Sequence, residues 1–396
     1  MNKDSVTEKT ELVAQSPSRT NCNYLYVWVD GQGTLRSSVF NTLNKKPTIQ
    51  RFDGSATKQA STDNADLFLV PIKTYNDSEE WAFGMGYVLC EVQTADGTPH
   101  ASNTRADLAK FLLNNTSLTN EVSLGFEQEF FLINPTTRQP YMWPTNKDDK
   151  GVEQVMFPGP QGRYYAGSGD FVRGRTIIDA FSLMCNNIEL SLLSYNAGIC
   201  LSQWSFVTKQ STLLDACDDL IMRRFFLEKA AEESESSYGA TGNRCVISLS
   251  PKTFPGLEWN GSGCNFRIYL NNYTNSAGNP SLAKTICETI GDNHREHIAA
   301  YGIGNETRLI GKTQGISDYN KFSWGFGDRT ASICVPTIPN NIEAANDFMF
   351  IEDRRPGANV DPYAGVLALA RTLVNVVDLK VEKAIKTDTF SPKLVK

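Results

Sequence analysis

The sequence predicts an α+β protein with a small sheet domain at its N-terminus and a larger domain of strands and helices after it. Residues 21–103 contain short stretches of branched and aromatic residues separated by turn residues, which is the pattern of strands. From residue 104 onward, stretches with the apolar spacing of helices are interspersed with further strands. A chain of 396 residues is long enough for two domains. We therefore place them at residues 21–103 and 104–396, after a polar, disordered tail at residues 1–20.

The first domain is predicted to be a small mixed sheet. Residues 24–31 (YLYVWVDG) read as a strand that ends in a turn, and residues 33–37 resume a strand after it. Residues 55–66 are rich in Ser, Thr, Asp and Asn, so we expect a loop there. Further strands are expected at residues 67–71 and 86–92.

The second domain is predicted to combine long helices with strands. Apolar residues at helical spacing predict helices at residues 104–114, 175–188, 213–231, 281–290 and 361–376. Strands are predicted at residues 124–133, 245–249 and 266–270.

The composition excludes several classes of protein. A net charge of −6 argues against nucleic acid or an anionic membrane as the main partner. No apolar run approaches the roughly 18 residues of a membrane span, and residues 1–20 lack the apolar centre of a secretory signal, so we expect a cytoplasmic protein. The nine cysteines include no CxxC pair, which indicates reduced, mostly buried thiols.

Residues 350–357 (FIEDRRPG) carry four consecutive charges between apolar residues and a proline. In an extended segment the side chains alternate, so Glu352 and Arg354 point to one face while Asp353 and Arg355 point to the other. A carboxylate beside a guanidinium group on one face suits a pocket for a metal ion and an anion. The alternative is a solvated charge cluster near the end of a strand.

A second candidate segment is the predicted strand at residues 124–133 (LGFEQEFFLI). It places Glu127 and Glu129 on the same face of an apolar strand. Two carboxylates in such a position repel each other and are costly to desolvate, unless cations neutralise them. The segment therefore indicates a cation site.

Together, these two segments resemble glutamine synthetase of the eukaryotic type (type II). The resemblance runs from about residue 24 to residue 372, and further matches are VDGQGTLRSS, FDGSAT, QGRYY, NGSG, HIAAYG and residues 325–333. It implies the glutamine synthetase fold, with a β-grasp-like N-terminal domain and a larger catalytic domain built on a curved antiparallel sheet. It also implies rings of five subunits stacked in pairs, with active sites between neighbouring subunits.

The chemistry implied by the resemblance is an ATP-dependent glutamate–ammonia ligase that uses Mg²⁺ or Mn²⁺. Such an enzyme phosphorylates the side-chain carboxylate of glutamate, and ammonia then displaces the phosphate. Divalent cations neutralise the transferring phosphoryl group, and arginines hold the phosphate and carboxylate oxygens.

Transferred residue by residue, the metal ligands are only partly retained. On the ATP side, Glu127 and Glu352 match two ligands, and the third, a histidine in the family, falls on Asn265. An asparagine oxygen can still bind magnesium, so this site is weakened. On the glutamate side, only Glu129 matches a ligand.

The other two ligands on the glutamate side are glutamates in the family. Gly198 and Ser205 stand at their positions here. A glycine has no side-chain oxygen and a serine is neutral, so we expect this second metal site to be empty.

The resemblance also assigns the substrate-binding residues. Asp53 matches the ammonium-binding aspartate that a neighbouring subunit contributes. The remaining matches are the glutamate-contacting Arg308 and Arg354, the substrate-holding turn at Asn260 and Gly261, and the phosphate-contacting Arg329. Each has a structural alternative, because Asp-Gly-Ser is also a plain turn, Arg354 can pair with Glu352, and Asn-Gly is a hairpin signal.

Two further positions depart from the family. A second phosphate-contacting arginine is replaced by Cys334, which offers no cationic fork. The loop at residues 308–315 carries no acid where the family has the glutamate that helps to deprotonate ammonium.

The sequence thus favours a catalytically impaired homologue, a pseudoenzyme with a structural or regulatory role in a ring. That ring would be a homo-oligomer or a hetero-oligomer with an active glutamine synthetase. One alternative is an active ligase that binds ATP and glutamate and forms glutamine through a γ-glutamyl phosphate, or that joins a related acid and amine. Another is a sensor that binds a nucleotide or an amino acid without turnover.

Overall fold

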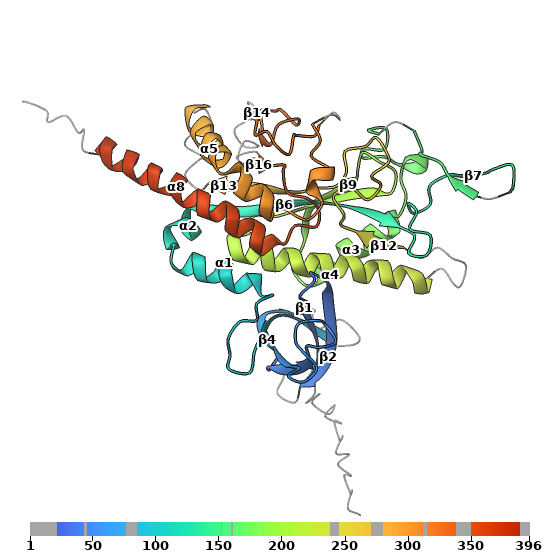
Figure 1. The fold of residues 1–396 in the computed structure, drawn as a ribbon, viewed down its shortest axis with the longest axis horizontal. Coiled ribbons are helices and arrows are strands. Elements are labelled where there is room, and N and C mark those ends of the chain that lie inside the picture. The colour runs from blue at the N-terminus through green and yellow to red at the C-terminus, as the bar shows by residue number, and fades with distance from the viewer. Residues whose placement is uncertain are drawn as a thin grey trace, which may run out of the picture.

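The structure is a computed structural model (Figure 1). It describes residues 22–42, 46–76, 85–151, 153–159, 161–237, 245–270, 280–311, 315–337 and 350–388. The predicted tail at residues 1–20 lies outside the described residues. Helices and sheets are combined in one molecule, which confirms the α+β class.

The first five strands form one mixed sheet in the order β2-β1-β5-β4-β3. Strands β1 and β5 are parallel, and the other neighbours are antiparallel. The strands are β1 (Cys22–Val29), β2 (Leu35–Thr42), β3 (Gln50–Asp53), β4 (Asp66–Asn76) and β5 (Met85–Gln93). Side chains alternate along β1, so that Tyr26 and Trp28 form a core within this sheet while Val27 packs toward the helices.

The larger sheet has the path β14-β15-β16-β13-β6-β10-β9, with β11 and β12 also paired to β6. All its neighbours are antiparallel except the pair β14 and β15. The strands are β6 (Val122–Ile133), β9 (Leu192–Ala197), β10 (Gln203–Thr208), β11 (Ser211–Thr212), β12 (Val246–Ser248), β13 (Cys264–Leu270), β14 (Trp324–Phe326), β15 (Ile333–Val335) and β16 (Ile351–Asp353). A separate hairpin joins β7 (Thr145–Lys147) and β8 (Glu153–Val155).

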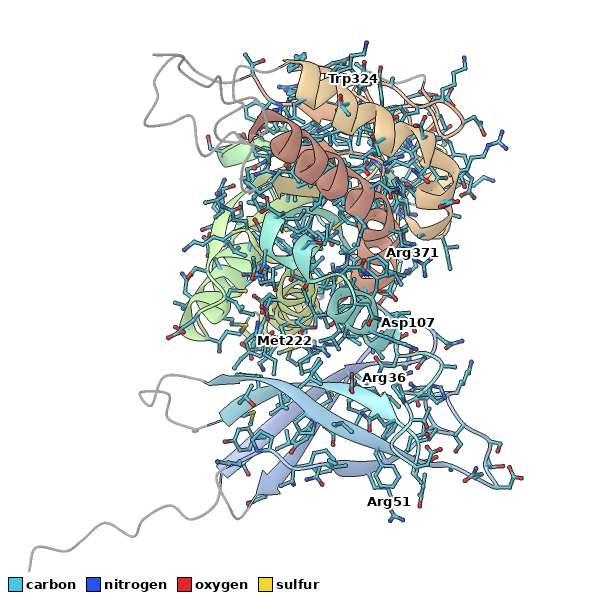
Figure 2. All side chains as sticks on the ribbon, turned by 90° about the vertical axis from the view of Figure 1, so that its left-hand side faces the viewer. Arg36, Arg51, Asp107, Met222, Trp324 and Arg371 are labelled. Atoms are coloured by element: carbon cyan, nitrogen blue, oxygen red, sulfur yellow. The ribbon has the colours of Figure 1, made fainter. Side chains whose placement is uncertain are left out.

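The helices of the larger part are α1 (Thr104–Leu113), α2 (Thr116–Glu121), α3 (Arg175–Asn187), α4 (Leu213–Ser237), α5 (Pro280–Asp292), α6 (His294–Ala300) and α8 (Pro362–Asp388). Figure 1 shows α1 and α4 between the N-terminal sheet and the larger sheet. In Figure 2, Met222 of α4 and Asp107 of α1 lie just above the N-terminal sheet, and Trp324 of β14 lies at the opposite end. Among the described residues, no helix is long and apolar enough to cross a membrane.

The central strand β6 separates the core from the candidate site. Phe126 and Phe130 pack into the main core, together with residues of α1, α3, α4 and α8. Between them, Gln128 accepts hydrogen bonds from Arg224 of α4. The intervening residues Glu127 and Glu129 therefore lie on the opposite face of the sheet.

Candidate active site

Three neighbouring strands bring the predicted ATP-side ligands together. In the register between β13 and β6, Asn265 lies directly opposite Glu127. In the register between β13 and β16, Arg267 lies directly opposite Glu352. Because Asn265 and Arg267 are two residues apart on one strand, all four side chains share one face of the sheet.

Arg267 fills the space between the two carboxylates. Its guanidinium group donates a short hydrogen bond to Glu127 Oε2, and its Nε lies 3.7 Å from Glu352 Oε1. Arg354 Nη1 binds the other oxygen of Glu352 at 2.9 Å. Glu352 is therefore held between two guanidinium groups. The ion pair between Arg354 and Glu352, which was the alternative to a substrate-binding role for Arg354, is present in the structure. Sequence analysis did not single out Arg267, although its spacing from Asn265 was a signal that it shares the site face.

The two carboxylates respond differently to this environment. Burial favours the neutral form of Glu352, but Arg354 and Arg267 outweigh it and hold the pKa of Glu352 below its usual value. Burial and then the neighbouring charge of Glu352 raise the pKa of Glu127, against the opposing effect of Arg267. The site therefore carries its own cationic groups.

Glu129 occupies a second, separate position on β6. Its Oε2 accepts a hydrogen bond from the backbone N–H of Gly263 at 2.6 Å. Burial nevertheless raises the pKa of Glu129 to about 7. Directly opposite it on β10 stands Ser205, so the neighbouring strand supplies no carboxylate.

Gly198, the other substituted ligand position, follows β9. A Cβ atom at this position would lie 2.8 Å from the side chain of Gln203. That side chain is fixed by a hydrogen bond from its Nε2 to the carbonyl oxygen of Gly261. A longer residue at position 198 would therefore need Gln203 to move.

The residues present do not fit a divalent cation. Within the part of the chain that the structure describes, no three His, Cys, Asp or Glu side chains form a metal-binding group. The carboxylates Glu127 and Glu352 are engaged with arginines instead. Divalent cations of this kind need several free oxygen ligands, which Asn265 and Glu129 alone do not provide.

The predicted substrate-binding arginine Arg308 is buried and bonded to backbone. Its Nη2 donates to the carbonyl oxygens of residues 354, 355 and 356 at 3.1, 2.8 and 2.9 Å, and its Nε donates to Asn305. Burial lowers the pKa of Arg308 to about 10. The guanidinium group thus supports the loop that follows β16.

The predicted substrate-holding turn is ordered by Gln161. The side-chain amide of Gln161 donates to Asn260 Oδ1 and accepts from the backbone N–H of Asn260, each at 2.8 Å. Gly261 has a φ of 77°, and a Cβ atom there would lie 2.3 Å from the carbonyl oxygen of Pro251. Only glycine suits this position.

Arg329 is exposed and lines a cavity of about 870 Å³ in front of Glu352. Arg267, Glu352, Cys334 and Lys209 also line it. Burial raises the pKa of the Cys334 thiol, so it is a neutral group in this wall. The cavity is thus lined by three cationic side chains and one carboxylate that is already paired.

Asp53 is not brought to this cavity within one chain. It ends β3, and its carboxylate accepts hydrogen bonds from the hydroxyl and backbone N–H of Ser55 at 2.6 and 2.9 Å, which lower its pKa. Arg51 of the same strand lies at the far end of the molecule from Trp324 (Figure 2). The role of Asp53 across a subunit boundary stays a prediction.

The expected loss of an acid in the loop after Arg308 falls largely on residues 312–314, outside the described residues.

The opposite face of β16 carries a buried network. Sequence analysis placed Asp353 and Arg355 on this face but did not identify their histidine and tyrosine partners. Arg355 pairs with Asp353 at 2.6 Å and donates to Nδ1 of both His294 and His297 at 3.0 Å. Tyr301 adds a hydrogen bond to Asp353 at 2.8 Å. This network fixes the backbone of the strand that carries Glu352.

Comparisons with known proteins agree with the fold. No family model matches the chain. It is 34% identical over 359 residues to a glutamine synthetase from Colletotrichum gloeosporioides, covering 89% of this chain and 92% of the relative. It is 32% identical over 356 residues to glutamine synthetase cytosolic isozyme 1-4 from Arabidopsis thaliana, covering 88% of this chain and 93% of the relative. The solved structure of Plasmodium falciparum glutamine synthetase shares its fold, with a TM-score of 0.67, 16% identity and coverage of 92% of this chain and 74% of that one.

Proposed function

Because the chain belongs to the glutamine synthetase family, we propose that it is a catalytically impaired member, a pseudoenzyme with a structural or regulatory role in a ring-shaped oligomer. The observation that carries this proposal is the surroundings of Glu129. The facing strand offers Ser205 instead of a carboxylate, and Gly198 offers no side chain. The cation that the family places beside glutamate and the transferring phosphoryl group would have one carboxylate ligand here.

An ion bound at this position would also have to displace a proton from Glu129. A carboxylate must be ionised to bind a metal ion, and burial raises the pKa of Glu129 to about 7. At neutral pH this remaining ligand is therefore partly protonated. Phosphoryl transfer depends on divalent cations to neutralise the developing charge, so the loss of this ligand set removes the main source of catalysis.

The second candidate function is an active ATP-dependent ligase that joins glutamate, or a related acid, to ammonia or another amine. It is favoured by the cavity of about 870 Å³, in which Arg329 and Arg267 face Glu352. In that case Mg²⁺ or Mn²⁺ would bind with ATP and would draw on Glu127, Asn265, Glu352 and Glu129. The predicted contacts of glutamate with Arg308, Arg354 and the Asn260–Gly261 turn would then apply.

The test is phosphate release from ATP by the purified chain with Mg²⁺ or Mn²⁺, glutamate and ammonia. An active glutamine synthetase runs beside it, and Glu127→Ala serves as the blank. We expect the chain to release phosphate no faster than the blank. Release above the blank that requires both glutamate and ammonia would show a divergent ligase and overturn the proposal.

We propose the cytoplasm as its location, in line with the relative named as a cytosolic isozyme. Cell fractionation with antibodies against the chain tests this directly. Recovery in a membrane-bounded organelle would contradict it.

A further inference from the structure

The feature that carries a further inference is the position of the Arg267 guanidinium group. It lies between two carboxylates from different strands, Glu127 of β6 and Glu352 of β16. The side chains of Arg267, Glu127 and Glu352 are 17%, 21% and 6% exposed, so water does little to screen them. Two ionised carboxylates in such surroundings require a cation.

The guanidinium group is held in place from several sides. Its Nη2 donates to Glu127, and its cationic carbon lies 5.0 Å from the ring centre of Phe350. Its Nε is buried and has no hydrogen-bond partner among the described residues, and the nearest carboxylate oxygen is that of Glu352 at 3.7 Å. The second oxygen of Glu352 is bound by Arg354.

We propose that the Arg267 guanidinium group replaces the divalent cation between Glu127 and Glu352, so that this half of the site is neutralised by the chain itself. The inference deepens the proposed function, because it explains how the carboxylates persist without a metal. A divalent ion binds carboxylate oxygens at about 2.0–2.6 Å. At that position it would lie against a positive charge and compete for the same oxygens. Arg267 must therefore leave before a cation can bind.

The register of β13 makes the proposal testable by one substitution. Arg267→Asn removes the charge and adds a neutral oxygen ligand on the same face as Asn265, Glu127 and Glu352. Arg267→Lys is the matched control, because it keeps a positive charge at the position. Arg267→Asn combined with Glu127→Gln locates any ion that binds, since it removes one carboxylate.

The measurement is Mn²⁺ binding to the full chain, followed by the loss of the free-ion electron paramagnetic resonance signal. We expect no saturable binding to the wild-type chain or to Arg267→Lys. Arg267→Asn is expected to bind one Mn²⁺ per chain, with an affinity about 10- to 100-fold above any weak binding by the wild type, the size of effect seen when metal-supporting groups are changed. The double variant should lose this binding again.

Two results would overturn the proposal that Arg267 replaces the divalent cation. One is stoichiometric Mn²⁺ binding by the wild-type chain that Glu127→Gln abolishes. The other is a folded Arg267→Asn variant that binds no Mn²⁺. If that variant does not fold alone, it is refolded with Mn²⁺, and recovery of the native circular dichroism spectrum supports the proposal while failure to recover contradicts it. If the wild-type chain binds the cation but releases no phosphate, the proposal that Arg267 replaces the cation is wrong while the proposed function stands. The two proposals can therefore be distinguished.

Discussion

At the scale of single residues, the buried network behind β16 depends on neutral histidines. Arg355 only donates hydrogen bonds, so Nδ1 of His294 and Nδ1 of His297 must both accept. The protons therefore lie on Nε2, which in His297 donates to Thr372 at 2.9 Å. A second proton on either ring would face the charge of Arg355.

This arrangement predicts a loss of stability in mild acid. Burial first, and the charge of Arg355 second, lower the pKa of His297 to about 4, below the value of about 6.5 expected in the unfolded chain. As the pH falls below about 6.5, the unfolded state binds the proton and the folded state does not, so the folded state loses stability until the pH reaches about 4. Between pH 7 and pH 5 this amounts to about 2 kcal/mol.

Urea unfolding at pH 7 and pH 5 measures the effect in the wild-type chain and in His297→Gln. Glutamine can still accept from Arg355 and donate to Thr372, but it does not titrate. The stability difference between the two pH values should be smaller in the variant by about 2 kcal/mol. An unchanged difference would mean that His297 is not the titrating group.

At the scale of secondary-structure elements, one carboxylate connects three helices. Asp218 of α4 accepts two hydrogen bonds from Arg105 of α1 at 2.8 and 2.9 Å, and one from Tyr363 of α8 at 2.7 Å. Arg105 also lies 3.6 Å from Glu91 of β5 in the N-terminal sheet. Although burial opposes its charged form, the ion pair with Asp218 raises the pKa of Arg105.

Asp218→Asn should therefore destabilise the protein strongly. It leaves the mostly buried charge of Arg105 without its closest partner, a change that typically costs about 3 kcal/mol or more. Glu288→Gln is the control, because its pair with Lys284 is more than half exposed and contributes less than about 0.5 kcal/mol. Urea unfolding of both variants gives the comparison, and equal midpoints would show that Asp218 does not link the helices.

At the scale of the whole molecule, the site and the N-terminal sheet lie far apart. Figure 2 shows Arg51 and Trp324 at opposite ends, with the helices between them. The exposed apolar residues Val39 and Ile49 belong to the N-terminal part, as does Asp53. Asp53 does not reach the cavity of its own chain, so the role predicted for it requires a neighbouring subunit.

We expect the purified chain to form a ring whose mass is several times that of one 396-residue chain. Native mass spectrometry and analytical ultracentrifugation measure this. When the chain is co-expressed with a tagged active glutamine synthetase, mixed rings should appear in the tagged fraction. A monomeric chain that never co-purifies with the active protein would argue against the structural or regulatory role.

Much of the fold could be predicted from the sequence because the signals are local. The helices α1, α3, α4, α5 and α8 were found from apolar spacing, yet α4 and α8 continue to Ser237 and Asp388. The extension of α4 contains only Glu and Ser, so it shows no apolar periodicity, and the extension of α8 mixes Lys with single apolar residues such as Leu379 and Ile385. Strands β14 and β15 contain only three residues each, too few for a period to show.

The site was predicted less completely than the fold because its contacts depend on strand register. The alternation in residues 350–357 placed Glu352 with Arg354 on one face and Asp353 with Arg355 on the other, and the ion pairs of the structure follow these two faces. The partnership of Arg267 with Glu127 joins residues 140 positions apart, and it exists only because β13 pairs with both β6 and β16. No local pattern reveals such a contact.

The positive charge between Glu127 and Glu352 belongs to the side chain of Arg267, so it does not depend on the concentration of metal ions in the cell. Each newly synthesised chain contains one such guanidinium group. We therefore expect chelators and a shortage of magnesium or manganese to leave these strands paired, as they need no bound ion. In a mixed ring, such a chain would be the member that keeps its shape through metal starvation.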